Sequence, residues 1–151
     1  MTTPSDPYDV VLIGGGAAGA SGTLMLARAR RSVVMIDAGA PRNAPAAGVH
    51  GLLGREGMPP GELLARGRQE IARYGGQVLP GEVGDVVRDG GLFVLTLADE
   101  RRLRARRLLV ATGVVDVLPD VPGLRARWGR DVLHCPYCHG WEVRDQAIGV
   151  L

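Results

Sequence analysis

The sequence predicts an α/β fold in which helices cover a mainly parallel sheet, and three observations support this class. Short apolar runs at residues 10–13, 33–36 and 108–111 are typical of strands that are buried on both faces. Residues 17–30 favour helix and lie between the first two runs. Three consecutive glycines connect the first run to this helix. Together these segments make a strand–helix–strand unit of about 30 residues, which is the usual length for one.

The middle of the chain predicts a loop, a helix and a small group of strands. Residues 38–60 are rich in glycine and proline and predict an ordered loop, and residues 60–74 predict a helix that two glycines end. Strand-like runs follow at 77–79, 83–87 and 92–97, with "RDGG" as the hairpin signal between the last two. We expect these runs to form a small three-stranded antiparallel β-meander.

The last third predicts a domain boundary. The segment "LPDVPG", residues 118–123, is stiff and is the best candidate for a linker. We therefore expect one domain over 1–117 and a second over 118–151. Residues 147–151 form another strand-like run, at which the sequence stops. Because such a strand needs neighbours on both faces, we expect the second domain to be incomplete here.

Composition and charge exclude several classes of function. The chain has 151 residues, of which 46% are hydrophobic, so it is globular and long enough for one ordinary core. A net charge of +2 is too small to favour nucleic acid, and the basic run at 101–107 lacks aromatic residues that would stack on bases, so a solvated strand face explains it better. The polar N-terminus is no secretory signal, and no apolar run reaches the roughly 20 residues of a membrane helix. We expect a cytoplasmic protein without nucleic-acid or membrane partners.

A glycine motif with a downstream acid indicates a dinucleotide site. Gly14, Gly16 and Gly19 fit G-x-G-x-x-G, a pattern that is weak alone in a chain with 23 glycines. Here the motif follows a buried strand and opens a helix, and Asp37 ends the next strand. The glycines would allow a tight turn, a close approach of pyrophosphate to the backbone, and close helix–strand packing, while Asp37 would bind a ribose. The glycines alone leave FAD and NAD as alternatives.

The motif "HCPYCHG", residues 134–140, contains both cysteines of the chain. A zinc site requires four ligands, and one C-x-x-C supplies two, so a structural metal is disfavoured and we expect none. "CPYC" also occurs in glutaredoxins, but there it follows the first strand of a small domain. A redox pair has the chemistry it needs, because one thiolate attacks a disulfide and the second thiol resolves the product. A nearby helix start at Pro136 would favour the thiolate.

The chain resembles the N-terminal half of a thioredoxin-reductase-like flavoprotein of the pyridine nucleotide-disulfide oxidoreductase superfamily. The resemblance covers essentially all residues through "GGGAAG", "DAG", "ATG", "LPDVPG" and the C-x-x-C. It implies a Rossmann-like FAD-binding domain, followed by the start of a truncated NAD(P)H-type domain. The stretch "DAGAPRNAPAAGVHG" further resembles a subgroup that includes the dithiol oxidases of gliotoxin and holomycin biosynthesis.

The resemblance also implies a set of functional residues. In the family Cys138 meets the flavin and Cys135 meets the external substrate. His139 stands where thioredoxin reductases have an acid, and it would handle the proton. Arg42, Asn43 and His50 would lie along the FAD, although loop polar groups that cap turns remain the alternative. The cofactor-binding residues implied are Gly14, Gly16, Ala17, Ala18, Gly19, Asp37, Ala38, Arg42, Asn43, His50, Val83, Ala111, Thr112 and Gly113.

Three functions remain open at this point. The first is an FAD-dependent enzyme that passes electrons from NADPH through FAD and the cysteine pair to a thioredoxin-like protein or a small disulfide. The second runs in reverse, with a small dithiol as electron donor and oxygen as acceptor. The third is a non-catalytic FAD-binding fragment. The NADPH site is expected outside these residues, and the family implies a homodimer.

Overall fold

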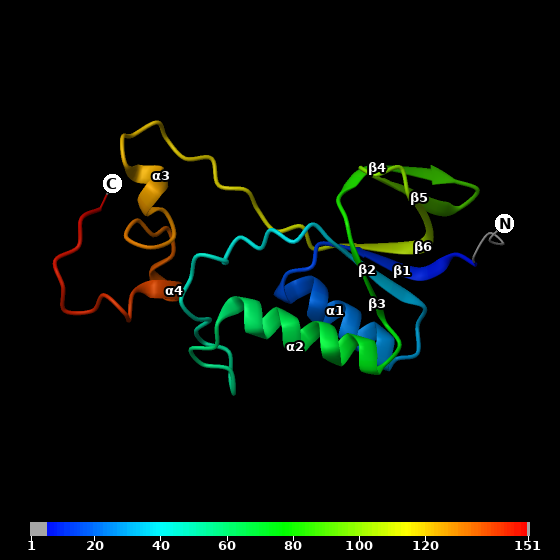
Figure 1. The fold of residues 1–151 in the computed structure, drawn as a ribbon, viewed down its shortest axis with the longest axis horizontal. Helices are drawn as coiled ribbons and strands as arrows, with labels where there is room; N and C mark the ends of the chain where they lie inside the picture. Colours follow the sequence, from blue (N-terminus) through cyan, green and yellow to red (C-terminus); the bar gives the residue numbers. More distant parts are fainter. Residues whose placement is uncertain (1–5, 151) are drawn as a thin grey trace. The chain divides into compact units, whose positions relative to one another are not determined.

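The computed structural model describes residues 6–150, and it confirms the α/β class (Figure 1). Six strands form one sheet in the order β3-β2-β1-β6-β5-β4. The strands are β1 (Tyr8–Ile13), β2 (Val33–Asp37), β3 (Gln77–Pro80), β4 (Val83–Asp89), β5 (Leu92–Leu97) and β6 (Arg102–Val110). The helices are α1 (Ala17–Arg28), α2 (Pro60–Arg73), and the four-residue helices α3 (Leu124–Arg127) and α4 (Pro136–His139).

The sheet is parallel at one side and antiparallel at the other. Strands β3, β2, β1 and β6 pair in parallel, while β5 pairs antiparallel with both β6 and β4. The nine-residue β6 therefore belongs to both parts. Its exposed arginines alternate with inward residues such as the fully buried Ala105, which confirms the solvated strand face expected for the basic run.

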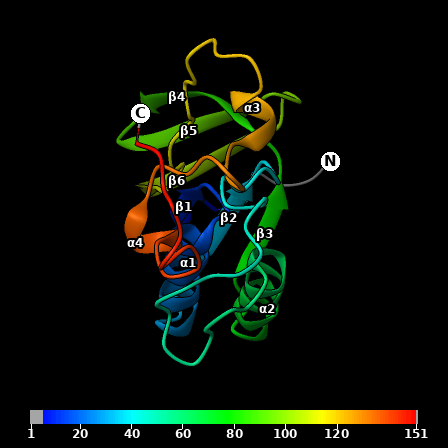
Figure 2. The same cartoon turned by 90° about the vertical axis from the view of Figure 1, so that its left-hand side faces the viewer.

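Alternation along β1 and β2 sends side chains into two hydrophobic cores. Leu12 and Met35 point to one face, where they pack with Ala27 of α1 and Ile71 of α2. In both views α1 and α2 lie side by side against this face (Figures 1 and 2). The neighbouring positions, with Val11 as an example, point to the opposite face and pack against β5. The parallel strands are thus covered on both sides, as their continuous apolar character predicts.

Three details of the predicted elements were wrong. The run at 77–79 does not join a meander; it forms β3, the parallel edge strand beside β2, and the third antiparallel strand is the first half of β6. The run at 108–111 is not a buried strand, because Leu109 is 40% exposed and Val110 is 64% exposed. Residues 147–150 have no regular structure, and Leu151 lies outside the described residues.

The chain folds into two compact units. One comprises Leu63–Val114 together with the described part of Met1–Pro41. The other comprises Arg42–Glu62 together with the described part of Val115–Leu151. The loop before α2 thus groups with the segment that contains the cysteines, although more than 50 residues separate them in sequence. No described helix has both the length and the apolar character needed to cross a membrane.

Candidate functional site

The glycine turn in the first unit is built as a tight strand-to-helix connection. Gly14 has a φ of +112°, a conformation that side chains disfavour, and a Cβ there would clash with the carbonyl oxygen of Ala111. A Cβ on Gly19 would clash with the carbonyl oxygen of Gly14. These two glycines therefore serve close packing, as the motif predicts.

Gly16 has a different role, because no other group approaches it. A Cβ at this position would meet no heavy atom within 4 Å, and its φ of −71° suits any residue. Gly16 is the N-cap residue of α1, and no side chain accepts a hydrogen bond from the N–H groups at this helix start. The first turn of α1 contains no acidic residue. The N–H groups at the start of the 12-residue α1, near Ala17 and Ala18, therefore remain available to an anion.

Asp37 lies at the carboxyl end of β2, beside the glycine turn. Its Oδ2 accepts a 2.6 Å hydrogen bond from Nη2 of Arg68, and its Oδ1 accepts a 2.9 Å bond from the Gly39 amide. Burial raises the pKa of Asp37, but these hydrogen bonds and the charge of Arg68 outweigh it, so the net pKa lies below its ordinary value. The carboxylate is thus ionised and oriented, as an acceptor for ribose hydroxyls must be.

Sequence reasoning missed two residues of this arrangement. A Cβ on Gly15 would clash with the Asp37 carboxyl, so the middle glycine of the triplet is what allows the carboxylate to lie against the turn. The position of Gly15 inside the run "GGG" was the sequence feature that could have identified this role. Arg68 lies 31 residues after Asp37 on α2, and no pattern in the sequence connects them.

The second predicted turn lies against the first. The Ala111 amide donates a 2.8 Å hydrogen bond to the carbonyl of Ile13, which places the end of β6 beside the glycine turn. Thr112 and Gly113 follow as exposed residues, and Gly113 has a φ of +70°. Ala38 is exposed next to Asp37, while Val83 opens β4 and packs on the core formed with β5. The structure gathers most of the predicted cofactor residues of this unit at one edge of the sheet.

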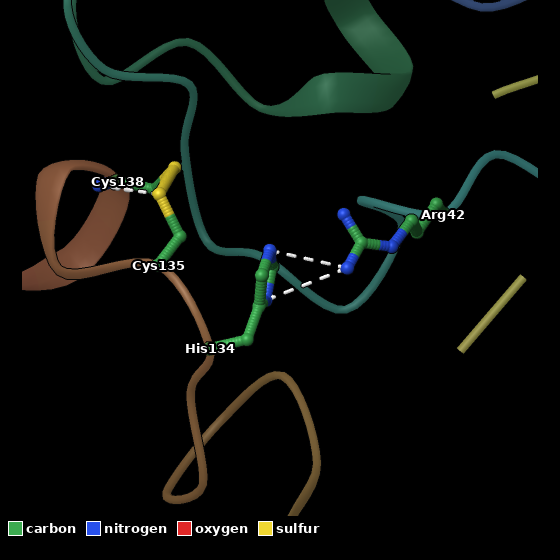
Figure 3. The surroundings of a disulfide bond; sticks show 4 residues. All are labelled: Arg42, His134, Cys135 and Cys138. Atoms are coloured by element: carbon green, nitrogen blue, oxygen red, sulfur yellow. Dashed lines mark hydrogen bonds between the residues drawn. A yellow bond between two sulfur atoms is a disulfide. The ribbon is translucent and has the colours of Figure 1, made fainter. Parts of the chain in front are cut away.

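The cysteines form a disulfide in the second unit (Figure 3). Cys135 is the N-cap of α4, and its Sγ accepts a 3.2 Å hydrogen bond from the backbone N–H of Cys138. Such a bond favours the thiolate when the disulfide is reduced. Cys135 and His139 are half-buried, while Cys138 is exposed. The described residues contain no group of three or more His, Cys, Asp or Glu side chains arranged to hold a metal ion.

Arg42 and His50 also lie in the second unit. Arg42 forms a two-pronged ion pair with Asp116. Arg42 also lies 3.1 Å from Nε2 of His134, the residue before Cys135, and Figure 3 shows this contact. The hydrogen bond from Arg42, together with one from Trp128, lowers the pKa of Asp116 to about 2. Asn43 lies in a turn in which its carbonyl accepts a hydrogen bond from Ala46.

His50 is held between two carboxylates. Its Nδ1 lies 2.6 Å from Glu56, and its Nε2 lies 3.6 Å from Glu142. The hydrogen bond to Glu56 raises the pKa of His50, burial opposes this, and the negative charges of Glu142 and Glu56 raise it further, so the net pKa lies above its ordinary value. Sequence reasoning did not identify Asp116, Trp128 or Glu142 as neighbours of these residues, because their pairing depends entirely on the tertiary structure.

The first unit is an α/β unit in which the glycine turn and Asp37 form a candidate dinucleotide cradle, and the second unit contains a C-x-x-C disulfide. The family described as pyridine nucleotide-disulphide oxidoreductase matches residues 8–148, and the chain belongs to it. The residues present fit the flavin that this family implies, because Gly16 leaves open space at an uncapped helix start and Asp37 presents an ionised carboxylate. The expected resemblance is thereby confirmed at the level of the family.

Known relatives agree with this assignment. The chain is 37% identical to a probable thioredoxin reductase of Arthroderma benhamiae, over 98% of this chain and 38% of that protein. It is 36% identical to the thioredoxin reductase tcpT of Claviceps purpurea, over 97% of this chain and 47% of that protein. The chain thus spans about half or less of the length of these relatives.

Solved structures show the same fold. The crystal structure of HlmI matches with a TM-score of 0.91 and 53% identity, over 96% of this chain and 47% of that one. An oxidoreductase from Agrobacterium tumefaciens matches with a TM-score of 0.86 and 45% identity, over 91% of this chain and 47% of that one. The Rossmann-like fold that the family resemblance implies is therefore confirmed.

Proposed function

We propose that this chain is the flavin-binding and redox-disulfide portion of an FAD-dependent disulfide oxidoreductase. In the complete protein, electrons pass between NADPH, FAD and the cysteine pair, and on to a thioredoxin-like protein or a small disulfide. The observation that carries the proposal is the Cys135–Cys138 disulfide in a chain that also contains a dinucleotide cradle. The membership of the chain in the family supports it.

The residues of the first unit bind and orient the cofactor in this proposal. The amides at the start of α1 bind the pyrophosphate, and Asp37 accepts hydrogen bonds from the ribose. Ala38, Val83 and the turn at Thr112 line the rest of the cofactor. Bound FAD supplies a two-electron carrier between the nicotinamide and the disulfide.

The cysteines carry out thiol–disulfide exchange. Two electrons and two protons convert their disulfide to two thiols. The Cys135 thiolate attacks the external disulfide, which forms a mixed disulfide and releases one substrate thiolate. The Cys138 thiolate then attacks Cys135, which restores the internal disulfide and releases the second substrate thiolate. His139, which directly follows Cys138, takes the proton from an attacking cysteine thiol and gives it to a leaving substrate thiolate, so that the two cysteine protons end on the two substrate thiols.

A second candidate is a dithiol oxidase, which runs the same exchange in reverse. A small dithiol reduces the cysteine pair and becomes a disulfide, and oxygen accepts the two electrons and two protons. His139 favours this candidate, because thioredoxin reductases carry an acidic residue at that position. The resemblance of "DAGAPRNAPAAGVHG" to that subgroup also supports it.

One titration of the full-length protein without oxygen separates these candidates. The visible flavin band is followed while NADPH is added, and then while a small dithiol is added to a second sample. Bleaching by NADPH supports the reductase, and bleaching by the dithiol alone supports the oxidase. Flavin that neither reagent bleaches would leave only the non-catalytic alternative. Light scattering in solution tests the homodimer, and fractionation of cells tests the cytoplasmic location.

A further inference from the structure

The segment that contains the disulfide has little packing of its own. We define residues 134–142 as the redox turn, which begins at His134 and ends at Glu142. Its only helix, α4, has four residues, and none of them is buried. Because buried apolar contacts do not hold the turn, other interactions must restrict the positions of the two sulfur atoms.

The first end of the redox turn is held by Arg42. Its Nε and Nη2 donate hydrogen bonds of 2.9 and 2.6 Å to the two oxygens of Asp116. The same Nη2 lies 3.1 Å from Nε2 of His134 (Figure 3). Trp128 completes this anchor. It donates a 3.1 Å hydrogen bond to Asp116, and its ring stacks on His134 with 5.8 Å between the centroids.

The second end of the redox turn is held by His50. Its Nε2 lies 3.6 Å from Oε1 of Glu142, while its Nδ1 lies 2.6 Å from Glu56 in its own loop. Glu56 is fixed in turn by a 2.9 Å hydrogen bond from the Gly51 amide. Both anchors thus come from the loop over Arg42–Glu62, and they contact the chain just before Cys135 and four residues after Cys138.

We propose that Arg42 and His50 are positioning residues that hold the two ends of the redox turn and thereby favour its disulfide form. The inference rests on the proposed function, in which this disulfide is the reactive group. Pinned ends reduce the number of conformations open to the turn, which raises the effective concentration of one thiol near the other. If one end of the turn is free, the two cysteine sulfur atoms are farther apart on average after reduction. The disulfide then re-forms less readily, so its reduction is more favourable.

The equilibrium with glutathione measures this effect directly. Two glutathione molecules reduce the internal disulfide: the Cys135–Cys138 bond breaks, one disulfide bond forms between the glutathiones, and both glutathione protons pass to the cysteine thiols. The full-length flavoprotein is equilibrated without oxygen in buffers of defined glutathione ratio. Acid quenching, alkylation and mass spectrometry then give the reduced fraction of the cysteine pair.

The variants are Arg42→Gln and Glu142→Gln, with Arg55→Gln as the matched control. Arg55 lies in the same loop, and its Nη1 bonds only to the neighbouring carbonyl of Gly54. We expect the equilibrium constant for reduction to rise about fivefold in each anchor variant and to stay unchanged in the control. Arg42→Lys, which keeps the charge but not the two-pronged bond, should show a smaller rise.

Double variants test whether the anchors are separate. His50→Gln with Glu142→Gln should change the equilibrium no more than either alone, because both remove the same contact, whereas Arg42→Gln with Glu142→Gln should multiply the effects. Wild-type equilibria in both single anchor variants would overturn the proposal, as would a loss of thermal stability without any change in the equilibrium. Failure of the proposed function shows separately, because the wild-type flavin would then bleach with neither NADPH nor a small dithiol, while the glutathione equilibrium still reports on the turn.

Discussion

Gly16 and Gly19 lie one helical turn apart but have opposite requirements for space. The site of a Cβ on Gly16 is open, while that of a Cβ on Gly19 is occupied by the Gly14 carbonyl oxygen. The same three-residue spacing therefore combines one position with open space, where we propose that the cofactor lies, and one position that close packing requires. The sequence motif shows glycine at both positions, and only the structure shows that the physical reason for glycine differs between them.

A pair of alanine substitutions tests this separation. Gly16→Ala should leave the stability of the flavin-free protein unchanged within about 0.5 kcal/mol, because the new methyl group meets nothing and α1 tolerates it. It should nevertheless weaken FAD binding, because the methyl group occupies the approach to the backbone. Gly19→Ala should cost about 2 kcal/mol or more, because backbone must move. Urea unfolding and fluorescence titration with FAD measure the two effects, and equal unfolding curves for both variants would contradict the assignment.

The contact between Arg68 and Asp37 predicts how FAD affinity depends on pH. The pKa of Asp37 is lowered, so the carboxylate proposed to bind ribose stays ionised above that lowered value and loses its charge only as pH falls through it. Arg68→Gln removes the hydrogen bond and the charge, so the pKa should rise and FAD affinity should begin to fall at a higher pH. FAD titrations between pH 4 and 8 measure this, with the exposed Arg73→Gln on the same helix as control. Identical pH profiles for wild type and Arg68→Gln would contradict it.

At the scale of the elements, α2 buries two large apolar side chains, Leu64 and Ile71. Ile71 is 0% exposed and packs in the core with Leu12, Met35 and Ala27. The other face of α2 is solvated, as its amphipathic sequence predicts. Since α2 also carries Arg68, the packing of Ile71 supports the geometry at Asp37.

Truncation of Ile71 should therefore be costly. Ile71→Ala should lower the free energy of unfolding by about 2–4 kcal/mol, because it leaves a cavity between α2 and the sheet. Gln69→Ala, on the exposed face of the same helix, should change it by less than about 0.5 kcal/mol. Chemical denaturation of both variants provides the comparison. Similar losses in the two variants would show that α2 does not dock through this face.

The strands show where prediction from local pattern succeeds and fails. The runs at 10–13 and 33–36 are apolar throughout and become β1 and β2 within a few residues of their expected bounds. The run at 77–79 was correctly expected to be a strand but was paired with the wrong neighbours. Local pattern reports burial and propensity, while the choice of β2 as the partner of β3 depends on how α2 returns the chain to the sheet.

At the scale of the whole molecule, the proposed electron path makes Cys138 indispensable. Cys138→Ser should abolish disulfide turnover of the full-length enzyme, because the serine hydroxyl neither forms a disulfide nor resolves a mixed one. It should leave FAD bound, because Cys138 and the glycine turn belong to different units. Steady-state assays together with the visible flavin spectrum measure both properties. Normal turnover by Cys138→Ser would remove the dithiol mechanism.

Residue types and spacing indicated a dinucleotide site and a redox cysteine pair, and resemblance to a known family then indicated the class of the protein. These signals are the glycine motif, Asp37 and the C-x-x-C. Each depends on contacts within a few residues or within a single strand–helix–strand unit, so each can be recognised from the sequence alone. Arg42 and His50 were expected to lie along the FAD, but the sequence did not show that their side chains contact Asp116, His134 and Glu142. Those partners lie 74 or more residues away, and only the closing of the chain into a second unit brings them together. Pairwise charge and hydrogen-bond contacts of this kind do not form a periodic pattern in a sequence, so only the tertiary structure shows that Arg42 contacts His134 and that His50 contacts Glu142.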